Sequence, residues 1–416
     1  MVHFKQFSYK QKSNAMNDQS LEKIQLLTDL RFGYFNSDYY NFLANEHKKI
    51  SNFGLNDYLA ISSDKKLRQL EADNSLFPND CQLQPPNLLP EVEEVLSLIF
   101  ERSVILVPDQ VQVYSEIFKA FSHKTDAFIF NQYAQTKIQI AADVLRKDGR
   151  DVFCLPYNRF DILEEQLIKL KSTHKHVWYL TSSIYSTTGN VIHIDLLKDL
   201  LMRYDHLRVL IDDSHGLSWT GKNGQGFAWK LLSDFPNVIF TASLCKGFGA
   251  AGRVLIPNYQ KMRDTISREI LRCGSVGLLN TYTLNVIRIA AMIHLSPEIY
   301  VRQIELQNRI AYFNAQAEKL QIPLESHSNT PIGFVHAGKP GLCQELSSNM
   351  QCKGFYLSPI TYPTLPINSS GLRVAISLYH SKATIKKMLL ALKTEYEKSL
   401  KKRGLKLSDN LISSEI

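Results

Sequence analysis

The 416-residue chain is predicted to fold as an α/β protein, with a mostly parallel central sheet flanked by helices and a smaller α+β domain at its C-terminal end. Between about residue 100 and residue 290, short apolar runs alternate with amphipathic stretches, a pattern typical of parallel strands connected by helices. Beyond residue 291 the pattern changes to long helical periodicity, then to short strand-like runs and a final helix. The length also favours more than one hydrophobic core. We therefore expect two packed domains.

The elements follow from short apolar runs and from helical periodicity, taken in chain order. Strands are predicted at 103–108, 126–131, 151–156, 176–183, 207–212, 237–243 and 252–257. In the C-terminal part, helices are predicted at 296–321 and 381–400, and strands at 331–336 and 372–378. The expected domains are an N-terminal arm (1–60), a large domain (61–290), a small domain (291–402) and a polar tail (403–416).

The composition is that of a soluble globular protein, with 44% hydrophobic and 21% charged residues. No apolar run approaches the roughly 18 to 20 residues that a membrane span needs. The N-terminal stretch is basic and polar and lacks the apolar segment of a secretory signal. The six cysteines show neither a C-x-x-C pair nor zinc-ligand spacing, so we expect reduced thiols and no metal site. These features predict a cytoplasmic protein with no membrane partner.

The net charge of +8, from 48 Lys and Arg against 40 Asp and Glu, is spread along the chain. The densest basic cluster, residues 398–406, forms the polar end of the predicted terminal helix, which is typical of a solvated tail. We therefore expect no nucleic-acid partner. The positive charge favours encounters with anionic substrates.

Chemically distinctive side chains follow three of the predicted strands. Asp212 and His215 end one strand, Ser243 and Lys246 end the next, and Ser186 follows the preceding one. Because the carboxyl ends of parallel strands meet at one edge of a sheet, we expect these side chains to lie together. The sequence therefore brings an acid, an imidazole, two hydroxyls and a lysine to one candidate site.

One cofactor requires this set of groups. Pyridoxal 5'-phosphate needs a lysine for a Schiff base with its aldehyde and a carboxylate to pair with its protonated ring nitrogen. Its phosphate needs hydroxyls and backbone N–H groups. The lysine, once exchanged for the substrate amine, can serve as a general base.

Five stretches resemble motifs of the α-oxoamine synthases, a family within the fold-type I pyridoxal-phosphate enzymes. DDSHGLSWTGKNGQG (212–226) resembles the family's D-D-[AS]-H-G-x-x-x-x-G-x-x-G-x-G motif and is the most specific match. The others are NFGLNDYLAIS (52–62), SIYSTTGNVIHI (183–194), TASLCKGFGAAG (241–252) and YPTLPINSSGLRVAISLYHS (362–381). The matches keep the family's order across roughly residues 52 to 400. The resemblance implies a fold-type I transferase.

The resemblance also implies a role for each residue at the strand ends. Asp212 is expected to pair with the ring nitrogen, and His215 to bond the phenolic oxygen of the cofactor. Ser186 is expected to position the polar edge of the cofactor, and Ser243 to bind its phosphate. Lys246 is expected to form the Schiff base. The glycines that follow Asp212 suit a bend that requires positive φ or close backbone approach.

Two further residues come from the resemblance alone. Arg373 matches the arginine that holds the carboxylate of the amino-acid substrate, a task that suits a planar, bidentate guanidinium. Thr281, within the stretch 274–285, matches a residue that reaches the partner subunit's phosphate. The resemblance therefore implies a homodimer.

Three stretches depart from the family. Residues 107–116 lack the glycine of the family's first phosphate-binding turn, and Asp109 is an unfavourable neighbour for a phosphate. Gln135 stands where the family has a ring-stacking histidine, and Tyr133 is an alternative aromatic partner. A glycine-rich stretch expected within 74–90 is absent.

We therefore weigh three functions. The first is decarboxylative condensation of an amino acid with an acyl thioester of coenzyme A or of an acyl carrier. The D-D-S-H motif at 212–215 favours this reaction. The second is an aminotransferase on the same scaffold, favoured by the missing synthase segments. The third is a non-catalytic protein that keeps the fold, motivated by Asp109 and Gln135.

Overall fold

The computed structural model describes residues 50–72, 85, 87–273, 278–325, 327–362, 364–366 and 368–405. Most of the predicted arm, most of the segment 74–90, the start of the segment 274–285 and most of the polar tail lie outside the described residues.

The central sheet has seven strands in the order β2-β8-β7-β6-β5-β3-β4. β8 pairs antiparallel with β2 and β7 and the other four strand pairs are parallel, so the prediction of a mostly parallel sheet is confirmed. The strands are β2 (Ile105–Val107), β3 (Ala127–Asn131), β4 (Val152–Leu155), β5 (Val177–Ser182), β6 (Leu207–Asp212), β7 (Val238–Ser243) and β8 (Arg253–Ile256). Each lies within one of the predicted runs.

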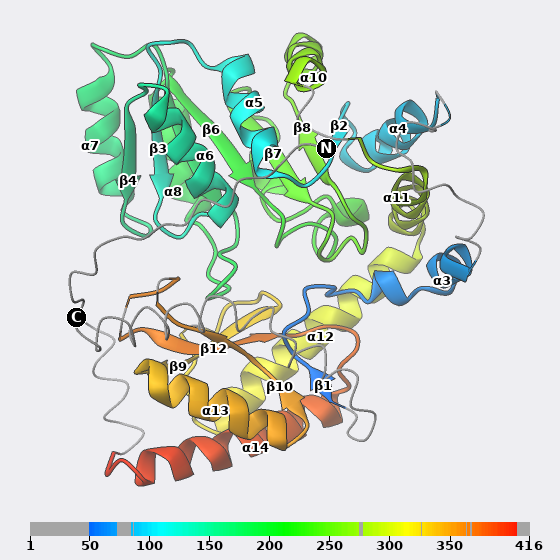
Figure 1. Cartoon of the computed structure of the whole chain (residues 1–416), viewed down its shortest axis with the longest axis vertical. Coiled ribbons are helices and arrows are strands. Elements are labelled where there is room, and N and C mark those ends of the chain that lie inside the picture. Colours follow the sequence, from blue (N-terminus) through cyan, green and yellow to red (C-terminus); the bar gives the residue numbers. More distant parts are fainter. Residues whose placement is uncertain are drawn as a thin grey trace, which may run out of the picture. The chain divides into compact units, whose positions relative to one another are not determined.

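Helices cover both faces of this sheet (Figure 1). On one face α5 (Val111–Phe121) packs between α6 (Thr136–Lys147) and α10 (Gln260–Cys273) over a core that includes Phe118 and Leu210. The alternate residues Val209 and Ile211 belong to a second core on the other face. The remaining helices of this part are η2 (Ile61–Ser63), α3 (Lys65–Ala72), α4 (Leu88–Phe100), α7 (Phe160–Leu170), α8 (Ile194–Arg203), η5 (Lys222–Gly224), α9 (Trp229–Leu232) and α11 (Thr281–His294).

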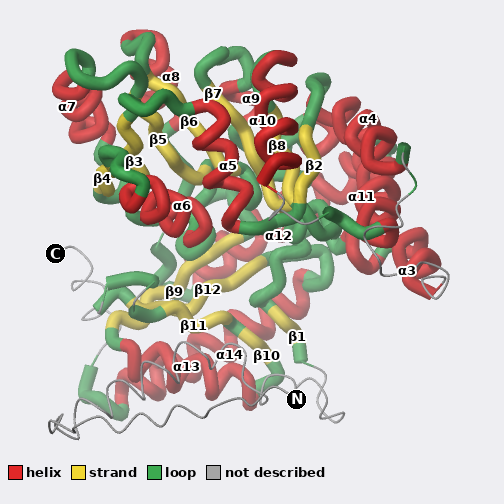
Figure 2. Tube along the Cα trace, turned by 45° about the horizontal axis from the view of Figure 1, so that its top comes forward, coloured by secondary structure: helices red, strands yellow, loops and turns green. Residues whose placement is uncertain are grey.

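A second, antiparallel sheet is built from the C-terminal part of the chain, in the order β11-β12-β9 (Figure 2). Helix α13 packs on this sheet and α14 packs on α13, while α12 contacts both α11 and α14. The short strand β1 pairs with β10, so the end of the predicted arm joins this part of the chain. The elements are β1 (Ser51–Asn52), α12 (Glu298–Lys319), β9 (Ile332–Gly338), α13 (Pro340–Cys352), β10 (Phe355–Tyr356), β11 (Ser358–Ile360), β12 (Ser370–Ala375) and α14 (Lys382–Lys401). Helix α13 was not among the predicted elements.

The strand register brings the polar strand ends together. Asp212 lies between Ser182 on β5 and Thr241 on β7, and Ser243 lies opposite Arg253 on β8. Since residues in register on neighbouring strands point to the same face, these side chains form two adjacent rows on the α5 side of the sheet. These two rows are the floor of the candidate site.

Candidate functional site

Asp212 is fully buried and accepts four hydrogen bonds. Its Oδ1 atom accepts from the Ser214 backbone N–H at 2.9 Å and from Gln135 Nε2 at 3.1 Å. Its Oδ2 atom accepts from Tyr114 Oη at 2.5 Å and from Arg253 Nη1 at 2.9 Å. Burial works to raise the pKa of Asp212, but Arg253 and the other donors lower it below its ordinary value. Asp212 is therefore an ionised carboxylate whose acceptor positions are filled.

Arg253 connects Asp212 to a second carboxylate. Its side chain is fully buried, its Nε atom donates to Asp109 Oδ1 at 2.8 Å, and its guanidinium lies over the Tyr114 ring. Thr241 Oγ1 accepts a further bond from Arg253 Nη1 at 3.0 Å. A buried guanidinium is tolerated because two carboxylates pair with it.

Asp109 lies two residues before the start of α5 and is contacted by three donors. Besides Arg253, Ser243 Oγ donates to Asp109 Oδ2 at 2.7 Å, and Lys137 Nζ lies 2.7 Å from Oδ1. Burial alone raises the pKa of Asp109, but Arg253, Lys137 and Ser243 together lower it to about 2. Asp109 is thus an ionised carboxylate in contact with Ser243. The sequence predicted this residue to be an unfavourable neighbour for a phosphate.

The second carboxylate of the motif, Asp213, faces away from this network. It accepts a hydrogen bond from Ser183 Oγ, and another from the Ala228 backbone N–H at 2.8 Å. A Cβ atom on Gly216 would lie 2.0 Å from Asp213 Oδ1, and a Cβ atom on Gly226, whose φ is 111°, would lie 2.4 Å from Oδ2. Close approach to Asp213 therefore requires glycine in this bend. Asp213 anchors the bend, and Asp212 faces the site.

His215 is buried beside Tyr58, from the N-terminal stretch NDYL. The Tyr58 hydroxyl and His215 Nδ1 share a hydrogen bond of 2.7 Å. Burial, followed by the nearby charges of Lys246 and Arg373, lowers the pKa of His215 well below its ordinary value. Burial raises the pKa of Tyr58 to about 12. Both groups are therefore neutral at pH 7 and available as hydrogen-bonding partners.

Arg373 on β12 does not face solvent as an edge-strand arginine would. It is 6% exposed, its Nη2 atom donates to Asn56 Oδ1 at 2.6 Å, and its Nε atom donates to the Ser186 backbone oxygen at 2.6 Å. Asn56 also accepts from the Tyr58 hydroxyl at 3.3 Å. Arg373 thus joins the small sheet, the loop after β5 and the N-terminal stretch around His215.

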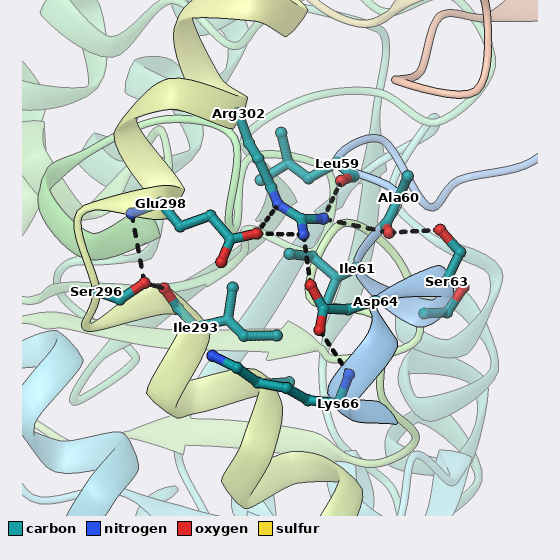
Figure 3. A network of polar contacts seen from close by, with 12 residues as sticks. Leu59, Ala60, Ile61, Ser63, Asp64, Lys66, Ile293, Ser296, Glu298 and Arg302 are labelled. Atoms are coloured by element: carbon teal, nitrogen blue, oxygen red, sulfur yellow. Dashed lines mark hydrogen bonds and ion pairs between the residues drawn. The ribbon is translucent and has the colours of Figure 1, made fainter. Parts of the chain in front are cut away.

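Arg302 of α12 holds the segment 59–64, which directly follows Tyr58 (Figure 3). Arg302 Nη1 donates to the backbone oxygen of Leu59 at 3.0 Å, and Nη2 donates to Asp64 at 2.6 Å. Glu298, one helical turn earlier, accepts from Arg302 Nε at 2.9 Å. Figure 3 shows these groups converging on one guanidinium, which fixes the backbone next to Tyr58.

Lys246 follows β7 and is half-buried. Among the described residues, no hydrogen bond or ion pair to its Nζ atom is present. Burial lowers the pKa of Lys246 to about 8, with Arg253 adding to the shift and Asp212 opposing it. The neutral fraction of this amine near neutral pH is therefore far larger than that of an exposed lysine.

The other predicted residues have different surroundings. Gln135 directly precedes α6 and uses its amide to bond Asp212, and Tyr133 packs against Tyr157 with ring centroids 5.3 Å apart. Thr281 begins α11 and is 7% exposed, and within the described chain its side chain makes no hydrogen bond to the residues above. Gln135, expected at the ring-stacking position, thus makes a polar contact with Asp212.

Sequence reasoning missed three residues of the network: Arg253, Tyr114 and Lys137. Arg253 had a visible signal, since it is the single charged residue in the otherwise apolar run GRVLIP. Tyr114 and Lys137 lie in ordinary amphipathic helices, where a polar residue predicts only a solvent face. Only their tertiary contacts distinguish them.

In the described part of the chain, no helix is long and apolar enough to cross a membrane. Nor do its His, Cys, Asp and Glu residues come together in a group of three or more that could hold a metal ion. Cys154, Cys245, Cys343 and Cys352 are free thiols.

The fold and the lysine, aspartate and histidine at the strand ends define a transferase of the aminotransferase type. Residues 48–392 match the family model of aminotransferase class I and II, and the chain belongs to this family. An 8-amino-7-oxononanoate synthase from Petrotoga mobilis is 22% identical over 348 residues, which cover 80% of this chain and 85% of that enzyme. The corresponding synthase from Dechloromonas aromatica is 24% identical over 355 residues, covering 82% and 89%.

Solved structures show the same likeness. A variant of the serine palmitoyltransferase from S. paucimobilis with a bound PLP–myriocin aldimine superposes with a TM-score of 0.74 at 14% identity, covering 85% of this chain and 89% of that one. An 8-amino-7-oxononanoate synthase from Francisella tularensis gives 0.66 at 18% identity, covering 83% and 97%. The predicted fold-type I architecture is confirmed, and these relatives are α-oxoamine synthases, as the motifs indicated.

Proposed function

We propose that the protein is a pyridoxal-phosphate-dependent transferase that condenses an amino acid with an acyl thioester, releasing CO2. The single observation that supports this most is Lys246: a half-buried amine with a pKa of about 8, in the turn after β7, the strand that pairs with the Asp212 strand β6, and close to His215. The names of the similar proteins support the same reaction class.

The residues fit the ring and aldehyde end of the cofactor. Lys246 supplies the amine, Asp212 an anion for the ring nitrogen and His215 a neutral partner for the phenolic oxygen. Gln135 Nε2 fills one acceptor position of Asp212, so this bond must give way to a ring N–H. At the phosphate end, the hydroxyl of Ser243 is bonded to Asp109.

The bound cofactor supplies an aldehyde for the substrate amine and an electron sink for the α-carbanion. In its neutral form Lys246 accepts the α-proton, while Asp212 keeps a negative charge beneath the site. Arg373 holds the substrate carboxylate until decarboxylation. The reaction joins the α-carbon to the acyl carbonyl carbon, breaks the C–S bond and releases a thiol and CO2, without an oxidant or reductant.

The proposal is tested with the purified protein loaded with pyridoxal 5'-phosphate. Amino acids are added one at a time, either with acyl-CoA or with a keto acid. Thiol release that depends on the amino acid supports the condensation, whereas amine transfer to the keto acid identifies an aminotransferase. A protein that gains no visible absorbance with the cofactor at any concentration is the non-catalytic scaffold.

The low pKa of Lys246 predicts how cofactor capture depends on pH. The rate of colour formation after mixing with the cofactor is expected to rise about tenfold per pH unit below pH 8 and to level off above it, because only the neutral amine attacks the aldehyde. Stopped-flow absorbance from pH 6 to pH 10 measures this. A rate that keeps rising to pH 10 would show that Lys246 titrates like an exposed lysine.

Arg373→Lys is expected to weaken amino-acid binding by about 1.5 to 3 kcal/mol, the scale of a charge-assisted hydrogen bond. A lysine cannot keep the separate contacts that Nη2 and Nε make with Asn56 and Ser186. Titrating the visible band of the loaded protein with the amino acid measures the change. Arg146→Lys, on α6, is the matched control with its own exposed ion pair to Asp143. An unchanged midpoint in Arg373→Lys and in Arg373→Ala excludes the role.

We also propose that the active form is a homodimer, in which Thr281 binds the phosphate of the cofactor held by the partner subunit. We further propose that the protein is cytoplasmic. The family resemblance supports the dimer, and the free thiols are compatible with a reducing compartment. Light scattering during turnover tests the dimer, because a strictly monomeric active species contradicts it.

A further inference from the structure

Apart from Lys246, the charged side chains on the floor of the site balance one another. Two carboxylates, Asp109 and Asp212, alternate with two cations, Arg253 and Lys137, and the contacts between them are 2.7 to 2.9 Å long. Two negative and two positive charges cancel. A phosphate group, with a charge of about −1.5 to −2 at pH 7, has no uncompensated cation in this set to pair with.

Asp109 also takes the hydrogen bonds that an anion at this place requires. It receives hydrogen bonds from Ser243 Oγ and Arg253 Nε and an ion pair from Lys137 Nζ. Its pKa of about 2 keeps it ionised at every pH of interest. A carboxylate thus occupies the donors of an anion-binding site.

One donor in this set has no acceptor. Arg253 Nη2 is buried and, among the described residues, it finds no hydrogen-bond partner. An unpaired buried N–H of a charged group is costly. A further acceptor oxygen beside Arg253 Nη2 would therefore be favourable. The guanidinium can serve a second anion once Asp109 moves away.

We infer that the Asp109 carboxylate competes with the phosphate of the cofactor for Ser243, Lys137 and Arg253. Before the cofactor binds, Asp109 takes the place of the phosphate at these donors. The inference rests on the proposed function, which assigns Ser243 to the phosphate. Loading then requires the Asp109 side chain to leave these donors. The phosphate therefore contributes little to cofactor affinity while Asp109 is present.

The test compares pyridoxal 5'-phosphate with pyridoxal, which lacks the phosphate, by equilibrium titration of the visible absorbance. Asp109→Asn keeps the shape and an acceptor oxygen but removes the charge. This variant is expected to bind pyridoxal 5'-phosphate at least tenfold more tightly than the wild type and pyridoxal within twofold of it. Asp161→Asn, which breaks an exposed ion pair with Arg159, is the control and is expected to change neither affinity.

The wild-type chain provides a test that does not depend on the variant folding. It is expected to bind pyridoxal 5'-phosphate less than tenfold more tightly than pyridoxal, and a ratio of tenfold or more overturns the inference. Equal phosphate-ester affinity in a folded Asp109→Asn also overturns it, while leaving the proposed function in place as long as both aldehydes give Lys246-dependent colour. Absence of colour with either aldehyde, in wild type and variant alike, refutes both the inference and the proposed function.

Discussion

Lys246→Ala is expected to abolish both the visible band of the lysine-bound cofactor and the turnover of amino acid. The chain has many lysines, but Lys246 combines three properties: it follows a strand of the parallel sheet, it is half-buried, and its pKa is lowered to about 8. An exposed lysine is protonated near neutral pH and attacks an aldehyde slowly. Absorbance of the loaded protein and an assay of thiol release measure the two losses.

The same variant is expected to remain folded. Lys246 has no hydrogen-bond partner among the described residues, and burial disfavours its charge, so its removal leaves no buried group unpaired. Thermal unfolding of Lys246→Ala and wild type, both without cofactor, checks this. Lys222→Ala, in the glycine bend with an exposed ion pair to Glu101, is the matched control and is expected to keep colour and turnover. A Lys246→Ala protein with an unchanged band would end the assignment.

Asp212→Asn is expected to reduce turnover by orders of magnitude and also to lower the free energy of unfolding by about 3 to 5 kcal/mol. The chemical loss follows from the missing charge beside the ring nitrogen. The loss of stability follows from Arg253, which keeps only Asp109 as an anionic partner when Asp212 becomes neutral. The asparagine amide would also place N–H groups opposite donors such as Tyr114 Oη and the Ser214 backbone N–H, which bond the carboxylate in the wild type.

Denaturant unfolding and steady-state kinetics separate these two effects. Asp213→Asn is the informative comparison, because Asp213 shares the strand end but bonds Ser183 and the Ala228 backbone instead of Arg253. We expect Asp213→Asn to disturb the glycine bend and to leave the charge beside Lys246 intact. A variant set in which Asp212→Asn works at near-full rate and Asp213→Asn does not would assign the site to the other carboxylate.

Much of the site was predictable because its information is local in the sequence. A short apolar run predicts a buried strand, and a polar residue directly after it predicts the carboxyl edge of the sheet. Asp212, His215 and Lys246 lie at that edge for this reason. Gly226 was expected to need unusual backbone geometry, and it has positive φ. The order of the strands did not alter these placements, since any parallel arrangement brings the same ends together.

The contacts that control the charge of the site depend on tertiary structure. Arg253 reaches Asp212 and Asp109 across separations of 41 and 144 residues, and Arg373 reaches Asn56 across 317. The residue types alone do not predict which carboxylates pair with Arg253. An arginine in an apolar run satisfies its donors with whichever acceptors the packing supplies. Local pattern therefore determined the fold, the edge of the sheet and the position of Lys246 at that edge. Packing decided that Asp109 holds the donors meant for an anion, because a buried charge must be paired by the groups that folding places within a few ångströms.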